Sequence, residues 1–121
     1  MLLTRLTHAC FFCLHSADGY DDLVVGAPLR SHNTLDPNQL YTGSAYVLFG
    51  RCDDASIPTL MDVTFLDGSR GIQIYGKAYG EESGFALASA GDINNNGADS
   101  ILVGSPYFGS TEGAAYVVTG C

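Results

Sequence analysis

The sequence predicts an all-β fold, and three features of the 121-residue chain support this prediction. Glycine is abundant, with 15 residues, and 7 tyrosines and 6 phenylalanines accompany it, as expected for many short strands joined by tight turns. Charged residues make up only 15% of the chain, below the roughly 25% of an average domain. The third feature is an internal repeat, in which the same order of turns and short apolar strands occurs twice.

The first segment, residues 1–16, matches nothing downstream and is predicted to be an atypical N-terminal leader. Arg5 precedes an apolar run from Ala9 to Leu14, a pattern that loosely resembles a secretory signal. The run is too short for such a signal, and His8 interrupts it. The leader therefore stays unassigned.

Four cysteines are present, and two of them, Cys10 and Cys13, have the C-x-x-C spacing of some metal and redox sites. The other two, Cys52 and Cys121, are isolated, so no second pair completes a metal site. No strand–helix context supports a redox motif. Incidental cysteines in the leader are the favoured interpretation.

The repeat begins at Ala17. Residues 17–28 (ADGYDDLVVGAP) superpose on residues 95–106 (NNGADSILVGSP) with a shift of 78. Residues 43–50 (GSAYVLFG) superpose on residues 113–120 (GAAYVVTG) with a shift of 70. The loop between the two matched segments is therefore eight residues longer in the first copy than in the second.

Each copy reads as a turn, an apolar strand, a proline that ends the strand, a variable loop and an alternating strand. Because Pro28 and Pro106 lack an amide donor, they end the ladder, and the two strands are expected to form an antiparallel hairpin. Further strands are predicted at Gly71–Tyr75 and Phe85–Ala90. No stretch shows helical periodicity with caps.

A repeated unit of up to four antiparallel strands with glycine turns is typical of a propeller blade. A β-sandwich is the alternative, and the close repetition of the turns favours the propeller. The prediction is a partial β-propeller of about two blades, a first blade at 17–75, incomplete at its start, and a second at 76–121 that ends after its third strand.

The turn of the second copy indicates a metal site. Asp92, Asn94 and Asn96 alternate along the turn, and Gly97 follows, so acceptors occupy positions 1, 3 and 5 of a calcium loop with glycine at position 6. Position 12, which is glutamate in the helical calcium hand, is Val103 within an apolar run, so a helical hand is rejected. The alternative is an ordinary turn, since Asn, Asp and Gly favour turns.

These residues resemble the FG-GAP repeats of integrin alpha subunits and of many bacterial and other extracellular proteins. Gly26, Ala27 and Pro28 reproduce the GAP signature, and DGYDDLVVGAP from Asp18 is similar to the family consensus. The second copy matches as GDINNNG before ILVGSP. The FG half is weaker, because Ser83 stands at the phenylalanine position. The resemblance covers about residues 17–120.

The resemblance implies a weak, structural calcium ion in the turn of each blade. In the second copy the implied ligands are Asp92, Asn94, Asn96, the carbonyl of Ala98 and Ser100, of which Asp92 alone is charged. Full sites of the family usually carry carboxylates at positions 1, 5 and 9. Since extracellular calcium modules already bind at roughly 10⁻⁴–10⁻³ M, this copy is expected to bind weakly.

The first copy has the complementary defect. Asp18, the carbonyl of Tyr20 and Asp22 fill positions 5, 7 and 9 of the implied loop, but position 1 falls on Leu14, which has no oxygen in its side chain. Position 3 falls on Ser16. The first site is therefore expected to be partial or inactive.

The formal net charge of −8 argues against nucleic acid as a partner, because a phosphate backbone would be repelled. No apolar run approaches the length of a membrane span. Glu81 and Glu82 are expected to form a charged turn rather than a hydrolytic carboxylate pair. No nucleophile motif such as G-x-S-x-G occurs, so a non-enzymatic protein is expected.

By resemblance, the chain is expected to be a calcium-binding propeller segment that serves adhesion or ligand binding outside the cell or at the cell surface. The alternatives are an accessory propeller of a secreted hydrolase, of phospholipase or nuclease type, and a truncated product without independent function. The loop 29–42, with Arg30, His32, Asp36 and Tyr41, is the best candidate contact surface, although a tolerated insertion is the favoured explanation of its length.

Closed propellers need about four to eight blades, and this chain encodes about two. An uncovered blade face leaves apolar surface exposed to water. The expected partners are therefore further blades of a longer chain, or other copies of this chain.

Overall fold

The computed structural model describes residues 11–15, 19–50, 62–63, 66–109 and 112–120, and for residues 11–15 it describes the backbone alone. The loop residue Asp18 and three of the cysteines, Cys10, Cys52 and Cys121, lie outside the described residues.

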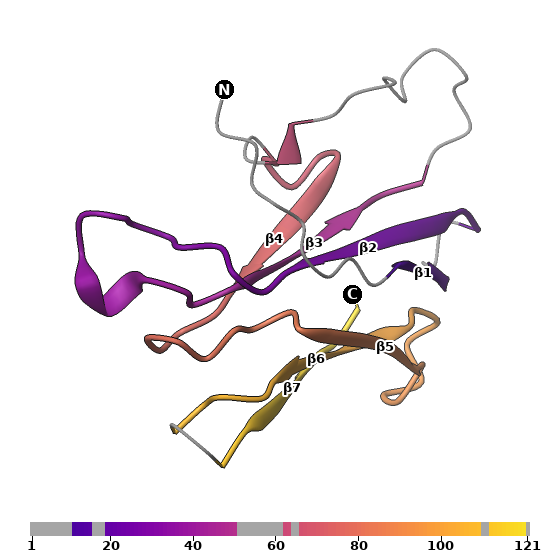
Figure 1. The fold of residues 1–121 in the computed structure, drawn as a ribbon. Helices are drawn as coiled ribbons and strands as arrows, with labels where there is room; N and C mark the ends of the chain where they lie inside the picture. Colours follow the sequence, from indigo (N-terminus) through magenta and orange to yellow (C-terminus); the bar gives the residue numbers. More distant parts are fainter. Residues whose placement is uncertain (1–10, 16–18, 51–61, 64–65, 110–111, 121) are drawn as a thin grey trace.

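The described chain forms two antiparallel sheets, which confirms the all-β prediction and is consistent with two propeller blades (Figure 1). The first sheet has the order β1-β2-β3-β4, with strands β1 (Phe11–His15), β2 (Asp21–Ala27), β3 (Ser44–Leu48) and β4 (Gly71–Tyr75). The second sheet has the order β5-β6-β7, with strands β5 (Ala86–Gly91), β6 (Ser100–Ser105) and β7 (Ala114–Val118). A single turn of 3-10 helix, η1 (Pro37–Gln39), lies in the β2–β3 loop.

Strand β1 is an element that sequence analysis did not assign, because it lies within the segment that matches nothing in the second copy. It pairs with β2 in antiparallel register, with Phe11 opposite Val25 and His15 opposite Asp21. Residues before the repeat thus supply the edge strand of the first sheet.

The two copies of the repeat have the same register. In the first copy Leu23 lies opposite Leu48 and Val25 lies opposite Tyr46. The residues at the shifted positions of the second copy pair in the same way, Ile101 with Val118 and Val103 with Tyr116. The sequence repeat is therefore a structural repeat of one hairpin.

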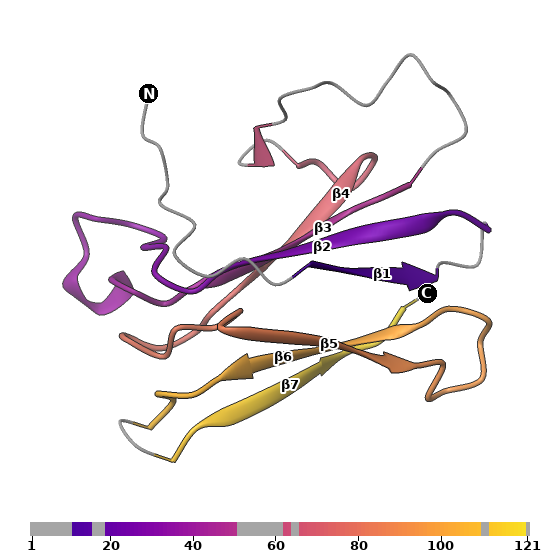
Figure 2. The ribbon, with the colours of Figure 1, turned by 45° about the vertical axis from the view of Figure 1, so that its right-hand side comes forward.

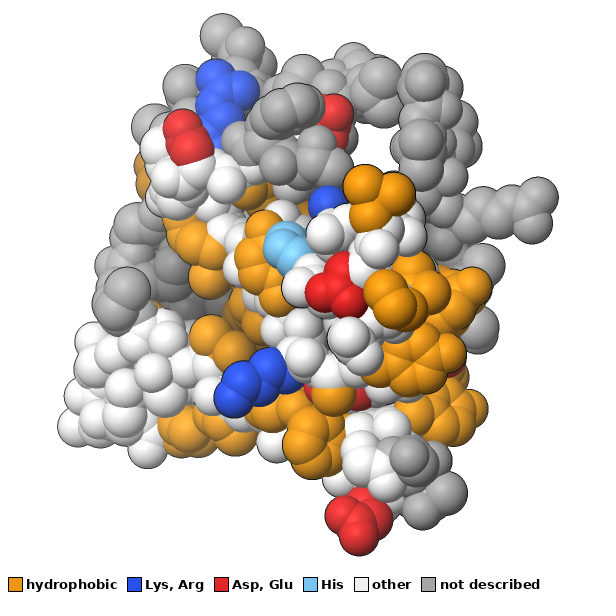
Figure 3. Space-filling view, turned by 90° about the vertical axis from the view of Figure 1, so that its left-hand side faces the viewer, with side chains coloured by type: hydrophobic (Ala, Val, Ile, Leu, Met, Phe, Trp, Pro, Cys, Tyr) orange, Lys and Arg blue, Asp and Glu red, His pale blue; other side chains and the backbone are white. Residues whose placement is uncertain are grey.

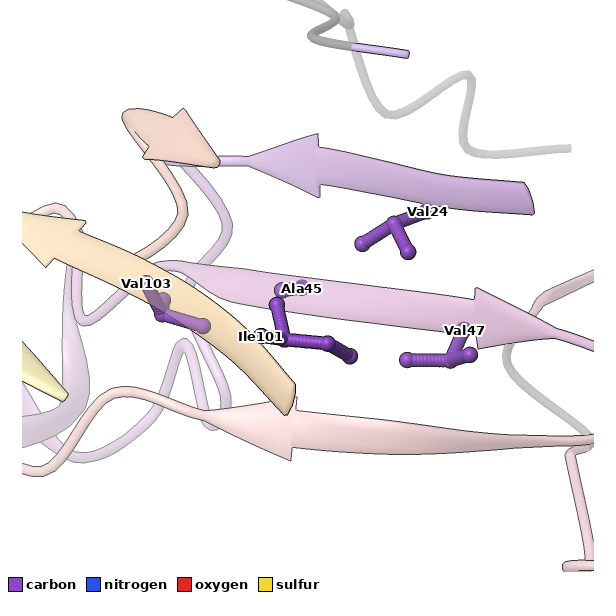
Figure 4. Close-up of a cluster of buried hydrophobic side chains, with 5 residues drawn as sticks. All are labelled: Val24, Ala45, Val47, Ile101 and Val103. Atoms are coloured by element: carbon purple, nitrogen blue, oxygen red, sulfur yellow. The ribbon is translucent and has the colours of Figure 1, made fainter. Parts of the chain in front are cut away.

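The hydrophobic core lies between the two sheets (Figure 4). Side chains alternate between the two faces of a strand, so every second residue of β2, β3 and β6 points into this layer. The core residues are Val24, Ala45 and Val47 from the first sheet and Ile101 and Val103 from β6. All five are at most 4% exposed.

Gly26 allows the two sheets to approach closely. A Cβ atom at this position would lie 2.2 Å from the carbonyl oxygen of Gly84, which precedes β5. Gly43 has the same role beside Ser83, with which it forms an isolated parallel bridge. The glycines of the repeat thus fix how one sheet sits on the other.

The connections gather at two opposite ends of the sheets (Figure 1). The β1–β2 and β5–β6 turns lie at one end, called here the turn end. The β2–β3 loop lies at the other, called the loop end, together with the β4–β5 and β6–β7 connections. The loop 29–42 therefore lies at the opposite end of the sheets from the candidate calcium turn. Within the described ranges, no helix is long and apolar enough to span a bilayer.

Candidate metal centre

The candidate metal centre is the turn between β5 and β6, residues 92–99. Gly91 and Ser100 pair at its base, after a register shift in β5 between Ser89 and Gly91. Asn95 and Gly97 have positive φ values of 56° and 87°. Asparagine tolerates this conformation and glycine adopts it freely, so the composition of the turn suits its path.

The carboxylate of Asp92 organises this turn. One oxygen, Oδ1, accepts a hydrogen bond of 2.9 Å from the amide of Asn96, and the other, Oδ2, accepts one of 2.7 Å from the amide of Gly97. The turn thus curls around the carboxylate at position 1. An ionised carboxylate has about four lone-pair sites, so each oxygen retains capacity for a further partner.

Asn96 connects the turn to the end of β7. Its Nδ2 donates a hydrogen bond of 2.7 Å to the carbonyl oxygen of Gly120, while its Oδ1 accepts one of 3.0 Å from the amide of Ala98. Asn94, the remaining side chain of the alternating set, is exposed. The amide oxygens of positions 3 and 5 therefore differ, because one is held by the turn and the other faces solvent.

Ser100, at position 9, carries a buried hydroxyl without a hydrogen-bond partner. The residue is fully buried, and Ala98 beside it is 4% exposed. Buried polar groups in proteins nearly always have a partner. An oxygen of this kind at the end of the turn is an observation that favours a ligand there.

The residues of the turn fit a weakly charged oxygen site. Calcium takes six to eight oxygen ligands from carboxylates, amides, carbonyls and water, and this turn offers each protein type around the carboxylate of Asp92. The second carboxylate of the turn, Asp99, accepts a hydrogen bond of 3.4 Å from the hydroxyl of Ser89. In the part of the chain that the structure describes, no three His, Cys, Asp or Glu side chains come together as a metal site. A bound ion would therefore depend on neutral oxygens and would tie the turn together.

The corresponding turn of the first copy is shorter. The β1–β2 pairing closes with His15 opposite Asp21, which leaves only residues 16–20 between the strands. Leu14, at position 1, lies within β1 opposite Asp22. The first copy thus has a strand where the second copy has the start of its loop.

Asp22, at position 9 of the first copy, is 3% exposed, and its Oδ1 accepts a hydrogen bond of 2.9 Å from the amide of Gly50. It therefore links the start of β2 to the second residue after β3. Tyr20 is 40% exposed. Of the three residues predicted for the first site, Asp22 thus has a structural bond, and Asp18 lies outside the described residues.

A cavity of about 180 Å³ lies between the sheets near the turn end, and sequence reasoning gave no indication of it. Both copies contribute to its mostly apolar lining, which includes Val47, Phe49, Ile101 and Val118. Its formation requires the packing of one sheet on the other, and a pattern within one strand does not report that packing.

The loop end carries exposed aromatic side chains (Figure 3). The exposed aromatic residues in its three connections and at the end of β4 are Tyr41, Tyr75, Tyr79, Phe85, Tyr107 and Phe108. Backbone hydrogen bonds join the connections, including Glu82 to Tyr41 at 3.1 Å and Ser83 to Thr42 at 3.0 Å. We call this set the aromatic loop surface.

The four residues predicted as contacts in the loop 29–42 have different environments. Arg30 donates a hydrogen bond to the hydroxyl of Tyr46, and the ring of His32 packs edge-on against Tyr75 with centroids 4.4 Å apart. Asp36 caps η1 by accepting a hydrogen bond of 2.9 Å from the amide of Asn38. Tyr41 is 49% exposed and so remains available for contact.

Glu81, which was predicted to be part of a charged turn, is fully buried in the β4–β5 connection. Its Oε2 accepts a hydrogen bond of 2.8 Å from the amide of Ala78, and its Oε1 accepts one of 3.3 Å from the hydroxyl of Ser105. The carboxylate thus links the β4–β5 connection to the end of β6. Its burial depends on contact between distant segments.

The chain is similar in sequence to two groups of curated proteins. It is 31% identical to integrin alpha-5 of Xenopus laevis over 106 residues, which cover 87% of this chain and 9% of that protein. It is 35% identical to phosphatidylinositol-glycan-specific phospholipase D of Bos taurus over 121 residues, which cover 97% of this chain and 13% of that protein. Integrin alpha-IIb of Mus musculus is 32% identical over 108 residues.

The chain therefore spans only about a tenth of the length of the relatives it matches. No family model matches the chain. The two groups of relatives differ in kind, since one consists of integrin alpha chains and the other bears the name of an enzyme, and the similarity extends over most of the chain in both.

Proposed function

We propose, from the distant homology of this chain to integrin alpha subunits and to phosphatidylinositol-glycan-specific phospholipase D, both of which contain FG-GAP repeats, that it is a non-enzymatic, calcium-stabilised propeller segment. Its role in this proposal is adhesion or ligand binding outside the cell or at the cell surface. Calcium is structural, and the aromatic loop surface makes the contacts.

The observation that carries the calcium part is the turn of the second copy. Asp92 organises the turn through the amides of Asn96 and Gly97, and the hydroxyl of Ser100 is buried without a partner. A cation bound by Asp92, Asn94, Asn96, the carbonyl of Ala98 and Ser100 would give that hydroxyl a partner. The ion would hold β5 and β6 together at the turn end.

Calcium titration followed by thermal melting tests this assignment. A ligand that binds only the folded state adds RT ln(1 + [L]/Kd) to stability, about 0.4 kcal/mol when calcium equals its Kd. We expect the melting temperature to rise in the millimolar range, and Asp92→Ala to abolish the rise. Asp36→Ala, which removes a carboxylate at the loop end, is the matched control and should keep it. An unchanged rise in Asp92→Ala would contradict the assignment.

Ligand binding is assigned to the aromatic loop surface because its side chains are exposed while its backbone is fixed. Tyrosine offers a large contact area at low entropic cost, and the hydrogen bonds between the connections limit the ordering needed on binding. Tyr79 is 62% exposed and Tyr107 is 50% exposed, so neither serves the core. These two are the residues whose removal should weaken contact without loss of folding.

A second function is an accessory propeller of a secreted hydrolase. The observation in its favour is the similarity to phosphatidylinositol-glycan-specific phospholipase D, which extends over 97% of the chain. Among the described residues, the carboxylate of Glu81 accepts a hydrogen bond of 3.3 Å from the hydroxyl of Ser105, but both side chains are fully buried and out of reach of a substrate. We therefore expect the chain alone to release no product from a phosphatidylinositol-glycan substrate. Release that disappears in Glu81→Gln would overturn the non-enzymatic assignment.

A further inference from the structure

The cavity between the two sheets extends from the core to the surface of the molecule. Its volume is about 180 Å³. Val47 and Ile101, which line it, belong to the core and are 2% and 4% exposed (Figure 4). Two other lining residues, Ile72 and Thr119, are exposed. The cavity is therefore open to solvent at one side and closed by apolar side chains at the other.

The lining of the cavity favours an apolar occupant over water. A buried water needs two to four polar partners, whereas this lining is mostly apolar, with Phe49 and Val118 beside the core residues. An apolar cavity of about 150 Å³ stays dry and binds benzene. The volume of about 180 Å³ thus has room for one aromatic ring with a small substituent, and a long acyl chain is too large for it.

The internal repeat shows which side chain is missing at this place. Position 7 of the loop is Tyr20 in the first copy and Ala98 in the second. The two positions have matching neighbours. A Cβ atom at Gly50 would lie 3.1 Å from the Cβ atom of Tyr20, and in the second copy a Cβ atom at Gly120 would lie 2.9 Å from that of Ala98. Ala98 and Gly120 both line the cavity.

The surroundings of position 7 explain why its change leaves a cavity inside the molecule. In the first copy the ring of Tyr20 is at the surface, since this residue is 40% exposed. Ala98 is only 4% exposed and lies against Gly120. Figure 2 shows that the chain after β7 runs toward the first sheet at the turn end. The second copy thus has a methyl group between the sheets at the position where the first copy carries an aromatic ring.

We propose that the cavity binds a neutral small molecule with a single aromatic ring, which fills the space beside Ala98. The ring packs between Val47 of the first sheet and Ile101 and Val118 of the second, all of which line the cavity. A bound molecule therefore adds an apolar contact between the two sheets. This site goes beyond the proposed function, and it depends neither on calcium nor on the aromatic loop surface.

The charges near the cavity select a neutral ring over an aromatic acid. Asp22 and Asp99 are among the lining residues, and the described residues of the lining include no Lys, Arg or His. The net charge of −8 repels anions in addition. Burial of an ionised carboxylate without a cationic partner costs far more than burial of a neutral ring. A phenol or an alkylbenzene therefore suits this site, and benzoate does not.

NMR titration of the full chain with p-cresol, which is the tyrosine side chain as a free molecule, tests the proposal. We expect saturable binding with a Kd of about 1 mM or below, within the range that so small a molecule attains. Nuclear Overhauser contacts should join its ring to the methyl groups of Val47, Ile101 and Val118. Benzoate should bind at least about tenfold more weakly, because its charge opposes burial. A calcium chelator in every sample keeps the result independent of the calcium assignment.

Ala98→Tyr gives the second copy the ring that the first copy has. The new side chain should occupy the cavity, so the affinity for p-cresol should fall at least about tenfold, as expected when the apolar space is filled. Ala115→Tyr is the matched control. It adds the same side chain at an exposed position of β7 that does not line the cavity, and it should bind p-cresol as the wild type does.

A wild type that shows no saturable binding of p-cresol would overturn the proposal. So would contacts of the bound ring that avoid Val47, Ile101 and Val118, or a folded Ala98→Tyr variant with the affinity of the wild type. Benzoate that binds as tightly as p-cresol would overturn the choice of a neutral ligand. If Ala98→Tyr does not fold, the contacts observed in the wild type decide alone, because they locate the ring without any substitution.

Discussion

The two copies of the repeat form the same hairpin, but different hydrogen bonds close its open end. In the first copy the carboxylate of Asp22 accepts a hydrogen bond from the amide of Gly50. In the second copy the shorter Ser100 has no such bond, and Asn96 instead donates to the carbonyl of Gly120. Gly50 and Gly120 are repeat counterparts, so both copies fasten the same place through different atoms.

The difference follows from the residues at positions 1 and 9 of each loop. The first copy has a carboxylate, Asp22, at position 9 and a leucine, Leu14, at position 1, which lies in β1. The second copy has Ser100 at position 9 and a carboxylate, Asp92, at position 1, where it organises a longer turn. One copy thus closes its hairpin end with protein bonds, and the other retains the oxygen-rich loop that suits a cation.

The largest expected difference between the copies is the cost of adding a methyl group at their shared glycine, which is Gly26 in the first copy and Gly104 in the second. Gly26→Ala should destabilise the chain by about 3 kcal/mol, since overpacking against a fixed backbone costs up to about that much. Gly104→Ala, the same change in the second copy, should cost less than about 1 kcal/mol. Urea unfolding of each variant, at a low micromolar concentration of protein, measures both costs. Equal costs would show that the two glycines have the same surroundings.

The valines at the next level of the repeat should differ by less. Val47 is 2% exposed and Val117 is 50% exposed. Val47→Ala removes two buried carbon atoms, and at about 0.8 kcal/mol for each it should cost about 1.6 kcal/mol, with a cavity cost in addition. Val117→Ala should cost less than half as much, because water already reaches that side chain.

Much of this arrangement could be predicted from the sequence, since the repeat carries it. The shifts of 78 and 70 residues predict two hairpins, and both have the same register in the structure. The glycine and proline positions mark the ends of the strands. The oxygen-rich turn at Asp92 was recognisable because its spacing reports side chains on one side of a single turn.

Features that depend on contacts between copies could not be predicted in this way. Strand β1 matches nothing in the second copy, so the repeat gave no signal for it. Glu81 looks like an exposed acidic residue in a turn, and it is buried because the end of β6 and the β4–β5 connection meet over it. The structural bond of Asp22 to Gly50 likewise joins residues 28 positions apart.

Exchange of the position-9 residues sharpens the comparison of the turns. Asp22→Ser should cost about 1–3 kcal/mol, because the half-buried amide of Gly50 loses its charged partner. Ser100→Asp should do the opposite in the second copy, where a second carboxylate at the turn should tighten calcium binding. Calorimetric titration of calcium into both variants checks this prediction. A Ser100→Asp variant with no tighter binding would argue against position 9 as a ligand.

The smallest expected effect is a loss of stability at high pH. It concerns Tyr46 and Tyr116, which stand at the same position in the two copies. Burial raises the pKa of Tyr46, and burial together with Glu81 raises the pKa of Tyr116. The folded state therefore holds the phenol protons more tightly than the unfolded state, whose tyrosine pKa is about 10. Stability from both groups is complete below that pH and is lost as the pH rises through the folded values.

Urea unfolding between pH 8 and pH 11, a range set around the tyrosine pKa of about 10, should therefore show a fall in stability above pH 10. Tyr46→Phe should flatten the fall, and so should Tyr116→Phe. The two copies differ in one respect, because Arg30 lowers the pKa of Tyr46 while Glu81 raises that of Tyr116. Arg30→Met should remove the lowering effect of Arg30 on the pKa of Tyr46. The pH dependence that Tyr46 contributes to stability should then become steeper. If Arg30→Met leaves the pH dependence of stability unchanged, the guanidinium of Arg30 does not shift the pKa of Tyr46, and its contact with that side chain is steric alone.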